Sequence, residues 1–87
     1  MRFEWNEEKN RLLKDSRDVS FEDVLLCIDE GRLLDVVPHH NLEKYPNQKL
    51  FIVRIRGYIY YVPFVEDEEK IFLKNIVPSR IYNKKYT

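Results

Sequence analysis

Histidines, tyrosines and basic residues are the side chains of this sequence that could act together in catalysis. His39 and His40 follow a proline in a polar stretch, whereas Arg54 and Arg56 alternate along an expected strand. Cleavage of RNA by its own ribose 2′-hydroxyl needs a base, a cation that stabilises the charge on the phosphate, and an acid for the leaving 5′-oxygen. Side chains of these types can supply all three groups without a cofactor. Arginine suits the second role because its planar guanidinium can hold two phosphate oxygens.

Each of these residues also has a simpler structural interpretation. Histidines in polar loops are more often solvated than catalytic. Arg54 and Arg56 are equally compatible with the solvent-exposed face of a sheet whose other face is buried. Tyr58, Tyr60 and Tyr61 lie near an expected hairpin, where cross-strand packing is more common than base stacking. Residue types alone therefore do not identify an enzyme.

Signatures of several other site classes are missing from the sequence. Its two glycines, Gly31 and Gly57, are expected to end a helix and to form a hairpin turn, and they belong to no phosphate-binding loop. One cysteine and two adjacent histidines do not match a usual zinc spacing. Ser20 suits a helix cap, and Ser79 lies in no nucleophile motif. These observations exclude glycine-rich nucleotide folds, zinc domains and hydrolase triads.

Composition favours one small soluble domain over residues 1–87. Of the 87 residues 44% are hydrophobic, which is enough for one core but not for two. The single Cys27 cannot form an internal disulfide, which suits a reducing compartment. No apolar run approaches the ~20 residues of a membrane span, and the N-terminus has no signal-peptide core. We therefore expect a cytoplasmic protein without a membrane segment.

The formal charge is zero, but the two halves of the chain differ. Residues 1–43 carry 11 acidic and six basic side chains, and residues 44–87 carry four acidic and nine basic ones. From Lys70 onward there are five basic residues and no acidic one. Charge runs are most often solvated surface, yet a basic half also allows contact with phosphate and an acidic half contact with a basic partner. Charge alone does not choose between these interpretations.

The expected elements give an α+β fold, with two N-terminal helices followed by a four-stranded antiparallel β-meander. A helix is expected over 7–17, and a second begins after the Ser20 cap and stops at Gly31. Short turns join the later elements and favour antiparallel neighbours. The expected strands cover 33–37, 49–56, 58–65 and 70–77.

Four positions in these strands carry further expectations. Pro63 implies an edge strand or a bulge, because proline cannot donate to a ladder. Arg54 and Arg56 are expected on one face of their strand, and Lys74 in the middle of the last strand. A basic sheet face of this kind can hold a ribose-phosphate chain.

Three short motifs, in order along the chain, resemble those of the BrnT-type ribonuclease toxins, relatives of the RelE superfamily in type II toxin–antitoxin pairs. Phe3-Glu4-Trp5-Asn6 is similar to the family's Phe-Glu-Trp-Asp start. Val19-Ser20-Phe21-Glu22-Asp23 is similar to its Val-Ser-Phe-Glu-Glu helix start, and Pro78-Ser79-Arg80 resembles its Ser-Ala-Arg motif. The resemblance implies a compact toxin fold of helices and an antiparallel sheet, metal-independent RNA cleavage, and neutralisation by an antitoxin encoded beside it.

The same resemblance assigns roles to individual residues. Arg80 stands where the family has the arginine that ends its Ser-Ala-Arg motif. Lys49 stands where an arginine opens the central strand, after Gln48 in place of a glutamate, and His40 matches a histidine of the preceding loop. The family's Lys-His-Gly before the second helix is Ser16-Arg17-Asp18 in this chain, and the C-terminal segment is shorter.

The leading hypothesis is an endoribonuclease toxin that cleaves RNA without a metal or cofactor and so inhibits growth. The expected catalytic residues are Arg80, His40 and Lys49, and the expected RNA-binding residues are Arg54, Arg56, Lys74 and Lys84. RNA and a cognate antitoxin are the expected partners, and a higher-order toxin–antitoxin oligomer is compatible with this hypothesis. Two alternatives stay open. One is a non-catalytic module that binds a protein through helix 7–17 and the sheet; the other is an RNA-binding protein that does not cleave.

Overall fold

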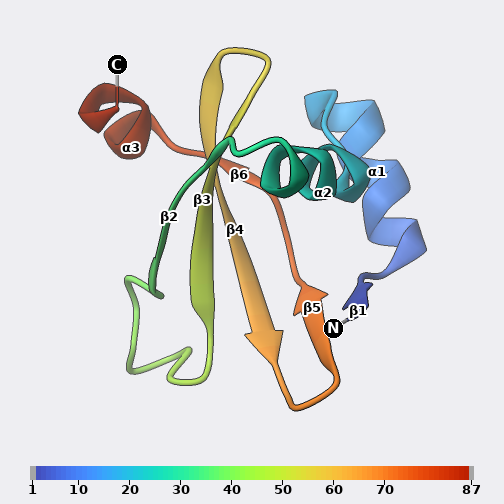
Figure 1. Cartoon of the computed structure of the whole chain (residues 1–87), viewed down its shortest axis with the longest axis vertical. Helices are drawn as coiled ribbons and strands as arrows, with labels where there is room; N and C mark the ends of the chain where they lie inside the picture. Colours follow the sequence, from blue (N-terminus) through green and yellow to red (C-terminus); the bar gives the residue numbers. More distant parts are fainter. Residues whose placement is uncertain (1, 87) are drawn as a thin grey trace.

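One mixed β-sheet organises the fold of the computed structural model, which describes residues 2–86 (Figure 1). Its strands lie in the order β1-β5-β4-β3-β2, and β6 pairs with β4 beyond the end of β5. Within residues 2–86, each helix is too short or too polar to cross a bilayer. In chain order the elements are β1 (Arg2–Glu4), α1 (Glu7–Arg17), α2 (Phe21–Asp29), β2 (Leu33–Pro38), β3 (Lys49–Ile55), β4 (Tyr58–Glu66), β5 (Lys70–Leu73), β6 (Val77–Pro78) and α3 (Arg80–Lys85).

The predicted α+β class is confirmed, but the predicted arrangement of two helices before a four-stranded antiparallel meander is wrong in detail. Strands β2, β3, β4 and β5 are successive antiparallel neighbours. Strand β1 precedes both helices and lies parallel to β5, which makes the sheet mixed. A third helix, α3, follows the sheet. The added elements β1, β6 and α3 have three, two and six residues, which is too short for hydrophobic periodicity to reveal them.

The last predicted strand, 70–77, is interrupted in the structure. β5 ends at Leu73, and β6 begins only at Val77. Between them the Asn75 side chain accepts a hydrogen bond from the Ile76 N–H at 2.8 Å, and the Arg17 guanidinium donates to the Ile76 carbonyl. These bonds occupy the backbone groups that a continuous ladder would use. The chain therefore leaves the ladder between the two strands.

Pro63 lies in the central strand β4, although the sequence predicts an edge or a bulge there. One side of β4 pairs with β3 along its length, and on the other side the partner changes from β5 to β6. Pro63 falls between those two partners, and its carbonyl accepts a hydrogen bond from the Lys74 N–H at 2.8 Å. The N–H and C=O of a strand residue point to the same side of the strand. The missing N–H of Pro63 therefore faces the interruption, where it breaks no ladder bond.

The predicted bounds of α1 are confirmed, and α2 begins at its predicted capping box. Ser20 accepts from the Asp23 N–H, and the Asp23 carboxylate accepts from the Ser20 N–H. Asn10 of α1 is fully buried; its amide donates to Glu22 at 2.8 Å and accepts from the Phe21 N–H at 2.8 Å. The bond from Asn10 is the main cause that lowers the pKa of the Glu22 carboxyl. These bonds fix α1 against the start of α2.

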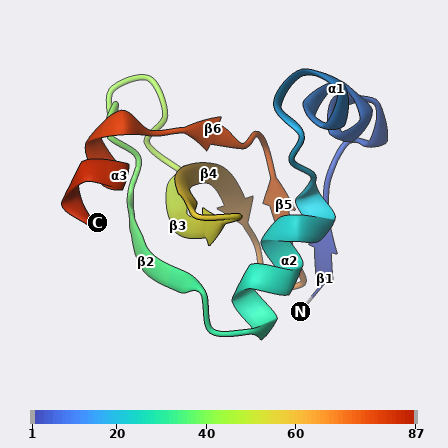
Figure 2. The same cartoon turned by 90° about the horizontal axis from the view of Figure 1, so that it is seen from above.

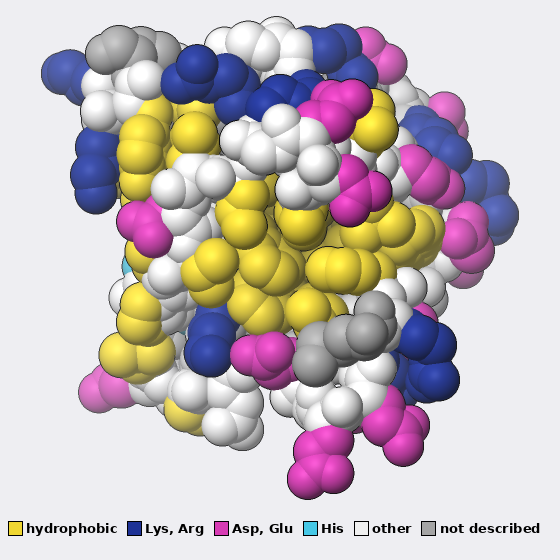
Figure 3. Space-filling model, viewed as in Figure 1, with side chains coloured by type: hydrophobic (Ala, Val, Ile, Leu, Met, Phe, Trp, Pro, Cys, Tyr) yellow, Lys and Arg dark blue, Asp and Glu magenta, His cyan; other side chains and the backbone are white. Residues whose placement is uncertain are grey.

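The first face of the sheet, which α2 crosses, carries the main hydrophobic core (Figures 1 and 2). The rings of Phe51 and Phe64 stack with their centroids 3.9 Å apart, and Trp5 stacks on Phe21 at 5.6 Å. Below α2 a yellow area of apolar side chains remains visible on this face (Figure 3). The buried members of this core are Leu13, Val19, Phe21, Val24, Cys27, Phe51, Val53, Ile55, Val62, Phe64, Leu73 and Ile76.

The second face of the sheet has a much smaller core. Only Leu50, Ile52 and Ile59 form its buried cluster among the described residues. Helix α3 lies over part of this cluster and contributes two tyrosines, Tyr82 and Tyr86. The loop between β2 and β3 and the strand β6 lie on the side of β3 and β4 opposite to α2 (Figure 2). The second face is therefore only partly covered by the chain's own elements.

Candidate functional site

Two neighbouring hollows lie on the second face and meet at His40 and Tyr61. The first, the lysine hollow, measures about 340 Å³. The second, the tyrosine hollow, measures about 350 Å³. Together they form the groove, whose two halves share no lining residue except His40 and Tyr61. The lysine hollow is lined by His39, His40, Tyr45, Gln48, Tyr61, Pro63, Lys74, Asn75 and Val77, and the tyrosine hollow by His40, Tyr61, Ser79, Ile81 and Tyr82.

The loop over 39–48 positions both histidines of the groove. The His39 N–H donates to the Gln48 carbonyl at 3.1 Å, which closes the base of the loop next to β3. Inside the loop, the Tyr45 N–H donates to the Asn41 carbonyl at 2.9 Å, and the Asn41 side chain accepts from the Lys44 N–H at 3.2 Å. A loop with its backbone groups satisfied in this way holds one conformation. His39 and His40 therefore have a defined place at the sheet.

His39 is held neutral, with one of its nitrogens already occupied. Its ring is buried, and Nδ1 accepts a hydrogen bond from the Asn41 N–H at 3.0 Å, which assigns the proton to Nε2. Burial, and secondarily the neighbouring His40, lower the pKa of His39. Because the Nδ1 lone pair already accepts a hydrogen bond, the His39 ring can donate a bond from Nε2 but is not available as a base. His39 packs against His40, with ring centroids 4.5 Å apart.

His40 is the exposed histidine of the pair and stands at the junction of the two hollows. Its ring meets that of Tyr61 edge to face, with centroids 5.3 Å apart and an interplanar angle of 87°. Tyr61 lies on β4 opposite Ile52, a residue of the second-face core. The sheet thus fixes Tyr61, and Tyr61 and His39 together fix the orientation of His40. Histidine is the side chain suited to accept and release a proton near neutral pH.

Lys74 supplies a positive charge on the far side of the lysine hollow. Its backbone N–H is bound to the Pro63 carbonyl, so the residue is anchored to β4 just after β5 ends. Its ammonium lies 5.3 Å from the centroid of the Phe72 ring, and its side chain is exposed. Lys74 is not mid-strand as predicted. The interruption between β5 and β6, with Asn75 beside it, turns both residues toward the groove.

Helix α3 forms the wall of the tyrosine hollow. Ser79 caps the helix by accepting from the Tyr82 N–H at 3.1 Å, and its own N–H donates to the Ile59 carbonyl at 3.0 Å. Asn83 accepts from the Ile59 N–H at 3.2 Å, which fixes the next turn of the helix. Ile81 is 80% exposed, which is unusual for so large an apolar side chain. The wall is thus rigidly attached and carries unpaired apolar surface.

The predicted catalytic Arg80 is an exposed residue at the first position of α3. Its chain neighbours Ser79 and Ile81 line the tyrosine hollow, but Arg80 itself does not, because consecutive side chains of a helix point in different directions. Lys84 lies in the last turn of the same helix, which carries no acidic residue. Neither Arg80 nor Lys84 lines a hollow, so of the predicted site residues the structure brings His40 and Lys74 together at the groove.

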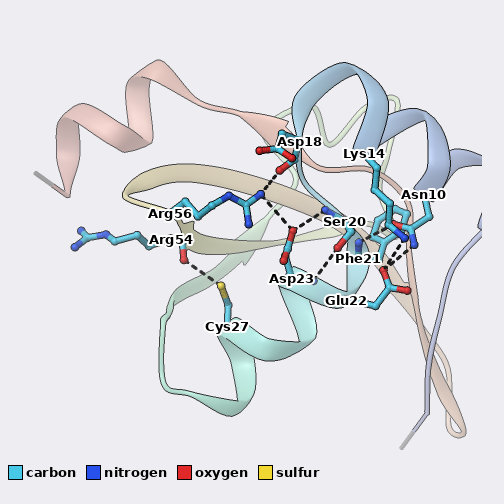
Figure 4. Close-up of polar contacts among 10 residues, drawn as sticks. All are labelled: Asn10, Lys14, Asp18, Ser20, Phe21, Glu22, Asp23, Cys27, Arg54 and Arg56. Carbon is cyan, nitrogen blue, oxygen red and sulfur yellow. Dashed lines mark hydrogen bonds and ion pairs between the residues drawn. The ribbon is translucent and has the colours of Figure 1, made fainter.

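Arg54 and Arg56 do not share one face, contrary to prediction (Figure 4). Arg54 lies on the second face, where its guanidinium donates to the Tyr86 carbonyl at 3.0 Å. Arg56 follows β3 with a φ of 48°, and its guanidinium reaches the Asp18 carbonyl and the Asp23 carboxylate beside α2. The left-handed conformation at the start of the turn breaks the alternation that the sequence pattern assumed. Arg56 therefore supports the α1–α2 junction.

Lys49 is also separated from the groove. It alternates with Leu50 along β3 and so lies on the first face, where its ammonium pairs with Glu66 at 3.2 Å. It borders a larger hollow of about 580 Å³, lined mainly by residues of β2 and the loop before β3. That hollow contains no histidine or tyrosine, and its single base is already paired with an acid. The smaller groove is therefore the better candidate site.

Several groove residues were not predicted as site residues from the sequence. Tyr61 was interpreted as cross-strand packing, Gln48 was noted only as standing at a glutamate of the similar family, and Asn75 has no motif around it. Tyr82 follows Ser79 by three residues, so the cap signal could have revealed α3. Among residues 2–86, no cluster of three or more His, Cys, Asp or Glu side chains could hold a metal ion.

Comparison with protein-family models, with curated proteins and with solved structures finds no match to this chain.

Proposed function

We propose that this chain is a metal-independent endoribonuclease toxin of the BrnT and RelE type, the toxic member of a toxin–antitoxin pair. The observation that carries the proposal is the groove, where an exposed histidine lies between two hollows, one of which is also lined by Lys74. The motif resemblance supports the same activity independently of this geometry. Single-stranded nucleic acid is bound in other proteins by the same combination of positive charge and exposed aromatic rings.

The proposed reaction needs only groups of the chain and the substrate. His40 removes the proton of a ribose 2′-hydroxyl, and the oxygen attacks the adjacent phosphorus. The bond from phosphorus to the 5′-oxygen of the next nucleotide breaks, and the Lys74 ammonium gives that oxygen a proton. The products are a 2′,3′-cyclic phosphate and a 5′-hydroxyl. The proton on His40 then returns to Lys74 through solvent, which restores the site.

Arg80 stabilises the charge that develops on the phosphate oxygens. It is exposed on α3, next in sequence to two residues that line the tyrosine hollow, and its long side chain would have to turn toward the groove to reach the phosphate. Arginine suits this role because its fork of N–H groups can bind two oxygens at once. Arg54 contributes positive charge from the second face, where it bonds to the Tyr86 carbonyl, and Lys84 adds a further charge in the last turn of α3. Lys49 and Arg56 take no part, because they lie near the opposite face.

The proposed partner is an antitoxin protein that contacts both α1 and the first face. Leu12 of α1 is 57% exposed, and apolar side chains remain visible below α2 (Figure 3). A partner that binds the native chain raises its apparent stability by mass action. The protein encoded by the neighbouring reading frame should therefore raise the melting temperature of this chain in a concentration-dependent manner. An unchanged melting temperature at saturating partner would remove that protein as the antitoxin.

The activity is tested by induction in bacteria and by cleavage of labelled RNA in EDTA. We expect wild-type chain to arrest growth and to cleave RNA equally well in EDTA and in magnesium. His40→Gln should lower the cleavage rate by about 10²–10⁴-fold, and Arg80→Ala by about 10²–10³-fold. Glu43→Ala, a change at an exposed residue of the same loop that lines neither hollow, is the control and should cleave normally.

Two outcomes would contradict the proposal. Cleavage that EDTA abolishes and magnesium restores would mean that a metal performs the reaction. RNA binding in the groove without any cleavage would instead identify a non-catalytic RNA-binding protein. In every case the variants must melt as the wild type does, so that a lost activity is not a lost fold.

A further inference from the structure

We infer that the groove binds two consecutive nucleotides of single-stranded RNA, one in each hollow, and that it reads the identity of only one base. The inference rests on the proposed function for the place of the reacting phosphate. It adds which nucleotide each hollow takes and which residues discriminate among bases. Its physical basis is the different lining of the two hollows.

The geometry divides the groove into two compartments. The hollows share only His40 and Tyr61, whose rings meet edge to face at 5.3 Å. A phosphate that contacts both hollows must therefore lie next to His40 and Tyr61. With the linking phosphate at His40, the nucleosides on either side of it extend into different hollows. Each hollow, at about 340 and 350 Å³, lies at the small end of ligand pockets.

The tyrosine hollow offers a surface without base discrimination. Its walls are the rings of Tyr61 and Tyr82 and the side chain of Ile81, which is 80% exposed. Every base has a π-face, so stacking on such walls tolerates any base. Ser79 is buried and its hydroxyl oxygen accepts from the Tyr82 N–H, so it offers at most one O–H donor to a base. This compartment supplies affinity rather than specificity.

The lysine hollow offers several hydrogen-bonding side chains, and those of Asn75 and His39 are held in position by hydrogen bonds. Asn75 accepts from the Ile76 N–H at 2.8 Å, which orients its amide and directs the NH₂ group away from that bond. Gln48 lines the same hollow and is half-buried at the base of the loop, where a bond from the His39 N–H to its backbone carbonyl fixes its main chain. His39 adds an Nε2–H donor, because its Nδ1 is occupied by Asn41. Oriented amide groups discriminate bases, since a wrong base leaves them unpaired.

The direction of the strand follows from the chemistry. The leaving 5′-oxygen belongs to the second nucleotide, and the Lys74 ammonium that protonates it lines the lysine hollow. The second nucleotide therefore lies in the lysine hollow and the first in the tyrosine hollow. Both bases must be unpaired to enter, so double-stranded RNA is excluded.

The test uses the sixteen dinucleoside phosphates with a 2′-O-methyl group on the first nucleotide, which blocks cleavage. NMR titration of the intact chain gives a dissociation constant for each. We expect one base at the second position to be favoured roughly fivefold or more over the others, with little difference at the first position. Gln48→Ala should remove this preference, whereas the exposed neighbour Asn47→Ala, which lines neither hollow, should retain it.

A second pair of variants tests the stacking wall without removing its bulk. Tyr82→Leu should weaken all sixteen ligands about tenfold, and Tyr82→Phe should bind as the wild type does. Preference at the first position, at both positions or at neither would overturn the inference, as would normal binding by Tyr82→Leu. These binding measurements need no catalysis, so they test the inference separately from the proposed enzymatic activity. Cleavage without the predicted preference refutes the inference alone, and the predicted preference without cleavage refutes the enzyme alone.

Discussion

The two faces of the sheet differ in how completely the chain covers them. Around the first face twelve buried residues form one cluster with α2, whereas the second-face cluster has three. On the first face aromatic rings stack on one another, as Phe51 does on Phe64. On the second face the rings belong mainly to tyrosines and histidines that border hollows. Stability is thus concentrated on one face, and the face with incomplete packing is left for a ligand.

The largest expected effect is on the first-face core. Phe21 is fully buried and stacks on Trp5, so Phe21→Ala should lower the free energy of unfolding by about 3–5 kcal/mol. Tyr82→Leu, which keeps apolar bulk on the second face, should cost about 1 kcal/mol or less. Urea denaturation of both variants measures the difference. Equal losses would mean that the second face contributes as much to stability as the first.

Two asparagines test the difference between the two faces. Asn10 accepts a hydrogen bond from a backbone N–H near the first face, and Asn83 accepts one near the second face. Asn10 is fully buried and satisfies Phe21 and Glu22, so Asn10→Ala should cost about 1–3 kcal/mol. Asn83 accepts from Ile59 beside the partly covered face, and Asn83→Ala should cost only about 0.5–1.5 kcal/mol. A larger loss for Asn83 in the same denaturation experiment would reverse the ranking of the two faces.

The pH dependence of stability comes from the loop that borders the groove. Because burial lowers the pKa of His39 in the folded chain, the unfolded chain binds the proton more readily. Stability should therefore be highest above the unfolded value of about 6.5 and fall as the pH drops from there to the lowered pKa. The pKa values of the Glu22 and Asp67 carboxyl groups are lowered from 4.5 and 3.8, so their protonation affects stability only at a more acidic pH.

Denaturation of His39→Phe between pH 7.5 and 5 isolates this contribution. The variant should lose the decline that wild type shows below about pH 6.5. A decline of the same size in both proteins would assign it to other groups. His40→Gln leaves the buried ring in place and removes only the secondary cause of its lowered pKa, so this control should keep most of the decline.

The smallest effect is expected for the ion pair of Lys49 and Glu66. Both side chains are largely solvated, at 57% and 39% exposure, so Lys49→Ala should change stability by about 0–1 kcal/mol. RNA cleavage by this variant should equal that of wild type, because Lys49 does not reach the groove. A strong loss of cleavage would return Lys49 to the catalytic site and contradict the division between the two faces.

Sequence patterns that span several residues predicted the fold well where local interactions determine the structure. The bounds of α1, the cap of α2 at Ser20 and the antiparallel pairing of the middle strands follow from capping and alternation. Short elements depended on distant contacts instead. β1 exists because β5 offers an edge to it, and α3 because Ser79 and Asn83 bond to Ile59. Such contacts leave no periodic signal in the sequence.

The candidate site was predicted only in part for a related reason. His40 was named from its residue type and from the family resemblance, and Lys74 from its place in an expected basic strand; the structure brings both to the groove. Alternation correctly put Arg54 on the second face, but it failed at Arg56, whose positive φ comes from the turn. It also could not reveal that β5 stops before Lys74. Gln48 and Asn75 have common side chains, and only the loop and the strand interruption make them neighbours.

The most direct test of the account is to map RNA binding by NMR on the uniformly labelled wild-type chain. A short single-stranded RNA with 2′-O-methyl riboses is titrated, and backbone amide shifts are followed for both faces of the sheet. We predict that the largest changes cluster at His40, Tyr61, Lys74, Asn75 and Tyr82, while amides around Lys49 and Arg56 move little. Changes centred on the first face, or the absence of any change at millimolar RNA, would contradict the claim that the groove is the functional site.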